Sequence, residues 1–278
     1  MAESIGSDAA PPGFDLAVLS DTGTNRPGNE DACGYFIEGP EAAVLVVADG
    51  IGGYEGGEVA SRMAVDITIE AYRESPPVWG AAKRLQRAVQ RANIEIHNRA
   101  IAVPELRRMG TTLTAVVVEG GRMSAAHVGD CRLYLARRGR ISQMTKDHTM
   151  VGERVRMGLL SAASARNHPD RSMLSRSLGR ELIVSVDRLS MPLVQNDHLL
   201  LCSDGLYNVF EDHEIEHLLQ PGGAAAICKA LIETANARGT ADNLTAAVLI
   251  MRGATPFAES AAGAGWRVWL SRLLGRRR

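Results

Sequence analysis

Four aspartates stand at the ends of apolar runs, and three of them adjoin a glycine. They are Asp49-Gly50 after AAVLVVA, Gly129-Asp130 after SAAHV, Asp204-Gly205 after LLLCS and Asp242-Asn243 before LTAAVLIM. An aspartate-glycine pair alone is a common turn, and Asp242-Asn243 alone is typical of a turn before a strand. Because the same pattern recurs at the ends of several expected strands, we expect these carboxylates to gather at one edge.

Gathered carboxylates would repel one another and raise each other's pKa values, so they need a counter-charge. Oxygen ligands without cysteine or histidine spacing favour Mg²⁺ or Mn²⁺ over zinc. A second acidic group, Asp21 with Glu30 and Asp31, surrounds Arg26. The guanidinium of Arg26 suits an oxyanion such as phosphate, although a lone arginine is most often a surface residue. Two cations and an arginine indicate metal-assisted phosphoryl chemistry.

Many short strands and a few helices must position these residues. Helical apolar spacing covers residues 57–74 and 79–103, and an alanine-rich helix is expected at 223–237. Strands are expected at 14–19, 43–48, 111–119, 122–128, 132–136, 198–202 and 244–251. The stretch from 111 to 142 is predicted to form one antiparallel meander. Strands in a run with helices in pairs predict an α+β fold and not a βαβ alternation.

Length, composition, net charge and cysteine spacing limit the classes of protein to which this chain could belong. The chain has 278 residues, 45% of them hydrophobic, which suits one large domain or two small ones. A net charge of -1 gives no indication of a nucleic-acid partner. Four scattered cysteines without CxxC spacing predict free thiols in a reducing compartment. No run approaches the roughly 18 apolar residues of a membrane span, so a cytoplasmic protein is expected.

The chain divides into four parts by composition. A polar lead at 1–12 is expected to be flexible and, without a basic or an apolar region, is not expected to act as a signal peptide. The domain follows at 13–252, with a polar flap at about 145–181. A small-residue linker at 253–265 precedes a basic amphipathic tail at 266–278, which carries two tryptophans, five arginines and no acid. This tail is expected to contact an anionic membrane surface or a partner, or to fold back onto the acidic body.

Six motifs in chain order resemble those of the metal-dependent protein phosphatase 2C family, in its bacterial branch. They are SDTGTNRPGNED, VVADGIGGYEGGEVAS, MGTTLTAVVV, AHVGDCRLYLAR, LLLCSDGLYN and GTADNLTAAVLI. The resemblance covers about residues 14–251. It implies a β-sandwich of two mainly antiparallel sheets flanked by helix pairs, an α-β-β-α arrangement. It also implies hydrolysis of phosphoserine and phosphothreonine on proteins, by direct attack of a hydroxide that bridges two Mn²⁺ or Mg²⁺ ions.

The same resemblance implies a role for each site residue. The implied metal ligands are Asp49 as the bridge, the Gly50 carbonyl, Asp204, Asp242, and the pair Glu30 and Asp31. Arg26 matches the arginine that holds the substrate phosphate. Asp130, with Asp204, matches the position that binds a third, weaker ion. The alternative for Asp130 is a turn aspartate paired with Arg132.

One residue departs from many eukaryotic members of the family. They have a histidine after the Asp-Gly pair, proposed as the acid that protonates the leaving group, where this chain has Ile51. Isoleucine has no proton to donate, so metal-bound water is the preferred acid here. His148, at the start of the flap, is a weaker candidate, because a loop histidine in a turn is the commoner case.

The sequence leaves two alternatives to an active phosphatase open. A catalytically weak or inactive scaffold on the same fold would bind phosphoproteins or a partner, but such proteins usually lose the metal carboxylates that this chain retains. A phosphatase with an aspartyl-phosphate intermediate would need a DxDx[TV] motif, and SDTGTN lacks the second aspartate. The expected partners are phosphorylated proteins, including a Ser/Thr kinase, and the expected state is a monomer.

Overall fold

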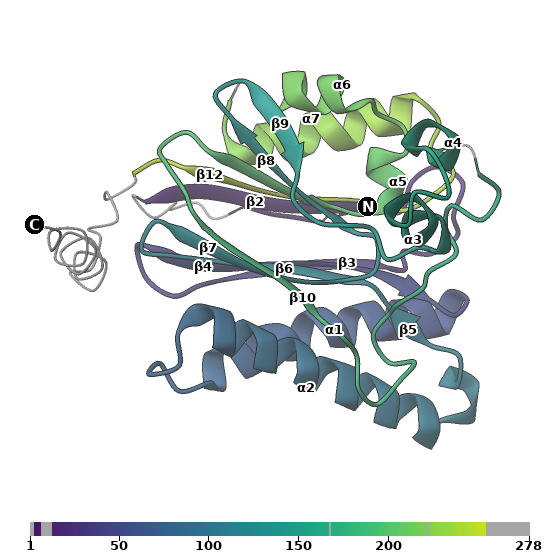
Figure 1. Ribbon diagram of the computed structural model, residues 1–278. Coiled ribbons are helices and arrows are strands. Elements are labelled where there is room, and N and C mark those ends of the chain that lie inside the picture. Colours follow the sequence, from purple (N-terminus) through teal and green to yellow (C-terminus); the bar gives the residue numbers. More distant parts are fainter. Residues whose placement is uncertain (1–2, 7–12, 167, 221, 254–278) are drawn as a thin grey trace, which may run out of the picture.

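Two antiparallel sheets stack face to face, and helices cover the outer face of each (Figure 1). The computed structural model describes residues 3–6, 13–166, 168–220 and 222–253. The first sheet has the order β1 (Glu3–Gly6), β2 (Phe14–Asp21), β12 (Leu244–Met251), β11 (His198–Cys202), β8 (Arg132–Arg137) and β9 (Arg140–Gln143). The second has the order β10 (Asp187–Pro192), β7 (Arg122–Val128), β6 (Leu113–Glu119), β4 (Ala42–Ile51) and β3 (Asp31–Ile37), with β5 (Gly110–Thr111) paired to the end of β4.

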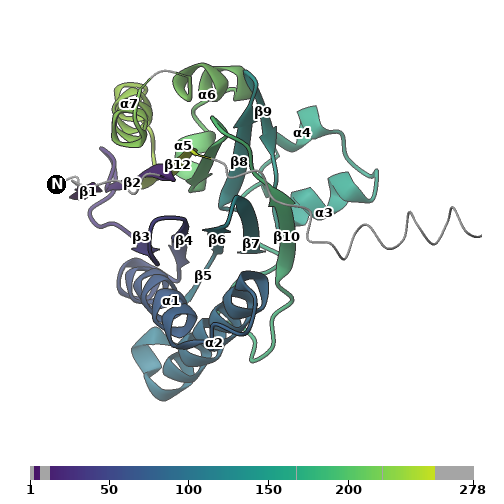
Figure 2. The same cartoon turned by 90° about the vertical axis from the view of Figure 1, so that its left-hand side faces the viewer.

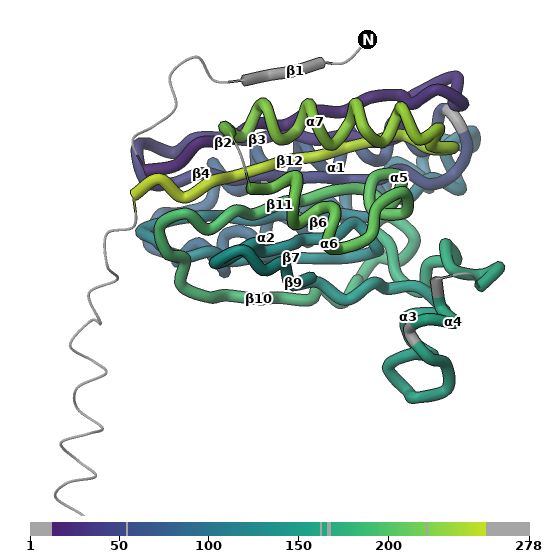
Figure 3. Tube along the Cα trace, turned by 90° about the horizontal axis from the view of Figure 1, so that it is seen from above, coloured from purple at the N-terminus to yellow at the C-terminus, as the bar shows by residue number. Residues whose placement is uncertain are grey.

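The helices form the two outer layers, which Figure 2 shows end-on. The pair α1 (Tyr54–Glu74) and α2 (Ala81–Ala102) packs on the second sheet and leads to a short 3₁₀ turn, η1 (Pro104–Leu106). On the first sheet lie α6 (Asp212–Leu218) and α7 (Ala224–Ala237), while α5 (Asp204–Tyr207) follows β11 directly. Two short helices of the flap, α3 (Met150–Arg156) and α4 (Ala162–Arg166), project from one end of the sandwich (Figure 3).

The position of strand β4 between two apolar layers explains why most of its sequence is a continuous apolar run, without alternating polar residues. Its side chains Val44, Val46 and Ala48 belong to the cluster packed under α1 and α2. The intervening Leu45 and Val47 belong to the cluster between the two sheets. Both faces of the strand are therefore covered, and all of these residues are fully buried. This confirms the α+β sandwich with helices outside that the sequence predicted.

The meander predicted for 111–142 is wrong, because its strands divide between the two sheets. Strands β6 and β7 pair in the second sheet, whereas β8 and β9 pair in the first. The chain crosses between the sheets at Gly129-Asp130, where Gly129 has a φ of 106°. A Cβ at this position would collide with the side chain of Thr112, so the crossing requires glycine. The crossing places Asp130 at the end shared by both sheets.

The N-terminal end of the domain differs from the sequence prediction. Residues Glu3–Gly6 pair with β2, so a flexible lead over 1–12 is wrong for this strand, and the rest of the lead lies outside the described residues. The tail at 266–278 and all but the first residue of the linker also lie outside them. Within the described ranges, no helix combines the length and the apolar character that a membrane crossing requires.

Candidate active site

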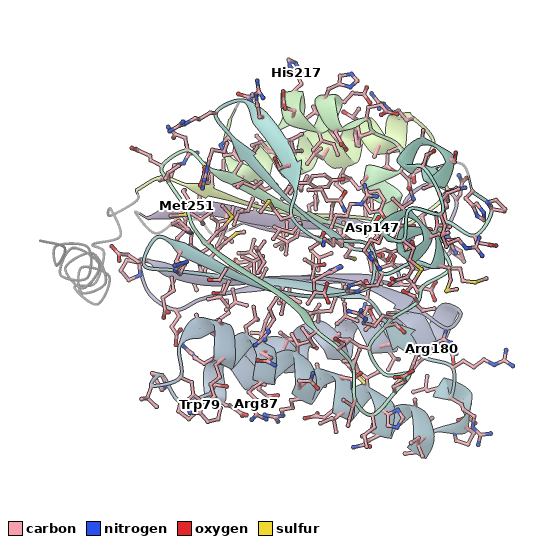
Figure 4. All side chains as sticks on the ribbon, viewed as in Figure 1. Trp79, Arg87, Asp147, Arg180, His217 and Met251 are labelled. Atoms are coloured by element: carbon pink, nitrogen blue, oxygen red, sulfur yellow. The ribbon has the colours of Figure 1, made fainter. Side chains whose placement is uncertain are left out.

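A cavity of about 720 Å³ opens at one end of the sandwich, between the strand ends and the flap. Figure 4 places Asp147 and Arg180 at this end and Met251 at the other. Seven of the eight site residues expected from the sequence line the cavity, namely Arg26, Glu30, Asp49, Gly50, Asp130, Asp204 and Asp242. The eighth, Asp31, is buried behind them, directly opposite Asp49 in the β3–β4 register. The flap contributes residues 172–177, Arg180 and Glu181 to the lining.

Asp49 stands where β4 leaves the sheet, and threonines hold its backbone. Its N–H donates to Thr112 Oγ1 at 3.0 Å, and its carbonyl accepts from the Thr112 N–H at 2.9 Å. The Thr111 hydroxyl donates to the same carbonyl at 2.8 Å. Burial raises the pKa of Asp49 well above its ordinary value, and the nearby carboxylates Asp31 and Asp204 raise it further. The backbone is therefore fully bonded, while the carboxylate faces like charges.

Asp31 is held by two hydroxyl groups from the opposite sheet. Its Oδ2 accepts from Ser203 Oγ at 2.6 Å and from Thr245 Oγ1 at 2.7 Å. Burial raises its pKa to about 7, although these two hydrogen bonds lower it. Sequence reasoning missed both hydroxyl residues. Their signal is a hydroxyl residue within three positions of an aspartate in an otherwise apolar run, in LLLCSDG and DNLTAAV.

Asn243, immediately before β12, connects the loop that contains Arg26 to the site. Asn243 Oδ1 accepts from the Glu30 N–H at 2.9 Å, and its Nδ2 donates to the carbonyls of Thr22 and Gly28 at 2.8 and 3.0 Å. Next to it, Asp242 forms an ion pair with Arg26 at 2.9 Å. Asn243 is therefore a positioning residue that the sequence motif contained but whose role it did not reveal.

Asp204 begins α5, immediately after β11. Its Oδ2 accepts from Asn208 Nδ2 at 3.2 Å. Burial raises its pKa to about 6, and Asp242 adds to the rise. Asp204 therefore adds a further oxygen donor to the acidic cavity.

Glycine is required where β4 meets α1. A Cβ on Gly50 would collide with the carbonyl oxygen of Gly57, and it would lie 2.7 Å from the carbonyl oxygen of Glu30. A Cβ on Gly57 would collide with the Glu30 carboxylate. The Gly50 N–H donates to the Glu30 carbonyl at 3.0 Å, which closes this contact. The strand, helix and acidic loop thus approach one another along their backbones.

Asp130 is buried, with 5% of its surface exposed, and burial raises its pKa well above its ordinary value. The structure does not support the alternative of an Asp130–Arg132 pair. Arg132 instead binds Asp147 through both Nε and Nη2, at 2.7 Å for the shorter bond. The carboxylate of Asp130 therefore remains directed to the cavity that it lines.

The prediction of His148 as a candidate general acid is wrong. Its side chain is 1% exposed, and it is absent from the described residues that line the cavity. Its Nδ1 accepts from the Gly129 N–H at 3.0 Å, while Nε2 lies 3.2 Å from Asp187 Oδ2. Arg176 binds the other oxygen of Asp187 at 2.7 Å. His148 thus joins the sheet crossing at Gly129 to the flap and to β10, which is a structural role.

The donor set fits a hard divalent cation. The cavity presents carboxylate oxygens from several strand ends, and their pKa values are raised by burial and by one another. Glu30 Oε1 is buried and has no hydrogen-bond partner among the described residues. Such an oxygen is costly unless a cation or another group satisfies it. In the described part of the chain, no three acidic, histidine or cysteine side chains already form a ligand group, so a cation would have to draw these carboxylates closer together.

In the absence of metal, the protein is expected to lose stability as the pH rises from about 4 to about 7. An aspartate has a pKa of about 4 when unfolded, whereas the fold raises that of Asp31 to about 7. The fold therefore favours the protonated acid, and this contribution is lost as Asp31 ionises. Melting temperatures measured in chelator at pH 5 to 8 test this. Asp31→Asn should flatten the decline, whereas exposed Asp66→Asn should not; a flat wild-type profile contradicts the expectation.

The fold and the acidic cavity together match the class that the motifs implied, a metal-dependent phosphatase. Residues 24–249 match the family described as Protein phosphatase 2C, and the chain belongs to this family. Serine/threonine phosphatase stp of Listeria innocua is 38% identical over 230 residues, which cover 81% of this chain and 91% of that protein.

Solved structures agree with this assignment. The Mycobacterium tuberculosis serine/threonine phosphatase PstP/Ppp is similar with a TM-score of 0.79 and 34% identity, over 87% of this chain and all of that one. The catalytic domain of PstP in complex with two manganese ions gives a TM-score of 0.77 and 33% identity, over 87% of this chain and 99% of that one.

Proposed function

We propose that this protein hydrolyses phosphate monoesters on serine and threonine residues of proteins. One observation carries the proposal: the fold brings seven of the eight expected site residues to one cavity at the strand ends. Family membership supports the same reaction, since the relatives are named serine/threonine phosphatases. The retained carboxylates argue against the alternative of an inactive scaffold.

We assign the cations to the acidic end of the cavity. Asp49, the Gly50 carbonyl, Asp204 and Asp242 would hold two ions, with Glu30 and Asp31 in support. Asp130, together with Asp204, would hold a third and weaker one. Manganese is the first choice because the PstP structure contains two manganese ions, and magnesium offers the same hard chemistry. When bound, the cations offset the charge of the phosphate ester and increase the acidity of water.

The residues of the chain supply the remaining steps. Arg26 lies on the cavity wall with 39% of its side chain exposed, and its guanidinium would bind the phosphoryl oxygens. In the structure it donates to Asp242, so a bound phosphate would compete with this carboxylate. Ile51 lines the cavity and has no proton to give. The proton for the leaving serine or threonine oxygen is therefore assigned to water.

We extend the proposal to cellular partners. The substrates would be phosphorylated proteins, including a Ser/Thr kinase, and the enzyme would remove the phosphate groups that such a kinase adds. The protein would act as a monomer in the cytoplasm. The basic tail at 266–278 would add contact with an anionic membrane surface or with a partner protein. Its five arginines and two tryptophans support this part of the proposal.

Peptide dephosphorylation tests the proposed reaction. Phosphate release from phosphoserine and phosphothreonine peptides should require Mn²⁺ or Mg²⁺ and should stop when a chelator is added. The same peptides carrying phosphotyrosine serve as the comparison and should react more slowly. A pure protein that binds the phosphopeptides but releases no phosphate at any Mn²⁺ concentration would support the scaffold alternative instead.

A further inference from the structure

Residues 178–185 carry one wall of the cavity, which Arg180, Glu181, Val184 and Ser185 line, and the segment is bonded to α2. The side chain of Asn93, a fully buried residue of this helix, accepts from the Gly179 N–H at 2.9 Å. The same amide donates to the carbonyls of Glu181 and Leu182, each at 3.0 Å. One buried amide thus binds backbone groups of three residues of this wall, Gly179, Glu181 and Leu182. Such a wall presents its side chains from a rigid base.

Two further contacts hold the ends of this segment. Leu178 and Thr111 exchange both backbone hydrogen bonds, at 2.8 and 3.2 Å, which connects the segment to β5. Gln90 Nε2 donates to the Val184 carbonyl at 2.9 Å. Because β5 pairs with the end of β4, the segment lies next to the strand that carries Asp49.

Arg180 extends from this wall into the solvent at the mouth of the cavity. It is exposed and lines the cavity, and a Cβ built on Gly110 would lie 3.5 Å from its Cγ. Gly110 pairs with Ile51, so the stem of Arg180 lies beside the end of β4. Figure 4 shows Arg180 at the same end of the sandwich as Asp147.

The arginines of the cavity differ in their partners. Arg26 forms an ion pair with Asp242, and Arg176 forms one with Asp187. No hydrogen bond or ion pair joins the guanidinium of Arg180 to any residue in the described ranges. Glu181 is a second exposed charged residue on this part of the wall; its backbone carbonyl accepts from Asn93, and no hydrogen bond or ion pair in the described ranges joins its carboxylate to Arg180. Arg180 is thus available to an anion that enters with the substrate.

We infer that Arg180 selects phosphoprotein substrates with a second anionic group close to the phosphorylated residue. This inference rests on the proposed function and adds a specificity determinant to it. A guanidinium binds a carboxylate or a phosphate through two parallel hydrogen bonds, so either an acidic side chain or a second phosphate suits it. Because the backbone of the wall is already ordered, the entropy lost when the anion binds is mainly that of the arginine side chain.

A set of phosphothreonine peptides tests the inference with Mn²⁺ present. Each peptide carries alanine, glutamate or phosphoserine at one flanking position, and the position is moved along the peptide. At one or more positions, kcat/KM should be about fivefold higher with glutamate or phosphoserine than with alanine, as expected for one exposed ion pair. Added salt should reduce this ratio. A larger ratio for phosphoserine than for glutamate would identify a second phosphate as the preferred anion.

Variants at Arg180 show whether this side chain causes the preference. Arg180→Ala should bring the ratio to about one, and Arg180→Glu should bring it below one. Arg188→Glu is the matched control, because Arg188 is exposed, binds Gln86 and lies outside the cavity lining, so it should keep the wild-type ratio. Equal rates for all wild-type peptides, or a preference that survives in Arg180→Glu, would overturn the inference. Failure of the proposed function is separate, since even the alanine peptide would then release no phosphate.

Discussion

Replacing Asp49 with alanine is expected to lower Mn²⁺-dependent kcat by about 1000-fold, the effect of removing a main electrostatic group from a reaction centre. Asp49 lies at the centre of the acidic cavity, and the raised pKa of its carboxyl reflects burial beside Asp31 and Asp204. No other residue of the site is bound to the sheet in the same way, through both Thr111 and Thr112. Hydrolysis of p-nitrophenyl phosphate over a Mn²⁺ titration measures the loss.

The stability of the same variant separates loss of chemistry from loss of folding. Asp49→Ala removes one of several repelling carboxylates, so its melting temperature in chelator should equal or exceed that of the wild type. The increase in melting temperature on adding Mn²⁺ should shrink or disappear. Exposed Asp66→Asn in α1 makes a comparable charge change and should retain full activity. Activity of Asp49→Ala within tenfold of the wild type would contradict the assignment.

Gly50→Ala is expected to cause the largest loss of stability among single-methyl changes at the site, about 3 kcal/mol. The added methyl would collide with the carbonyl of Gly57 and press on the carbonyl of Glu30. Both neighbours are backbone groups in a helix and in a hydrogen-bonded loop, so neither can turn aside as a flexible side chain would. The melting temperature should fall by roughly 6–12 °C for a domain of this size.

A second glycine provides the control for this prediction. Gly80, at the start of α2, has a φ of -57°, and a Cβ built there meets nothing within 4 Å. Gly80→Ala should therefore lower the free energy of unfolding by only about 0.5–1 kcal/mol, the cost of replacing glycine with alanine as the N-cap of this helix. Urea unfolding in chelator measures both variants without a contribution from metal. Equal stability of Gly50→Ala and Gly80→Ala would show that the backbone contact is less tight than the structure indicates.

The sequence alone predicted the features that depend on neighbouring residues. An apolar run that ends in Asp49-Gly50 or Asp204-Gly205 predicts a strand followed by a turn, because both patterns lie within a few residues. The sandwich with helices outside, the long helices and most of the central strands followed from such patterns and from the order of the family motifs. The motifs also named the site residues, and seven of the eight line one cavity.

Only the tertiary structure decided which distant residues meet. Asp31 reads as part of an acidic loop, yet it begins β3 and binds Ser203 and Thr245, which are 172 and 214 positions away. His148 reads as a loop histidine, yet the fold buries it between the sheet crossing and the flap. Arg180 gave no sequence signal, because its place on the cavity wall depends on Asn93 in α2. Local patterns determine strands and turns, but long-range packing determines which side chains share a site.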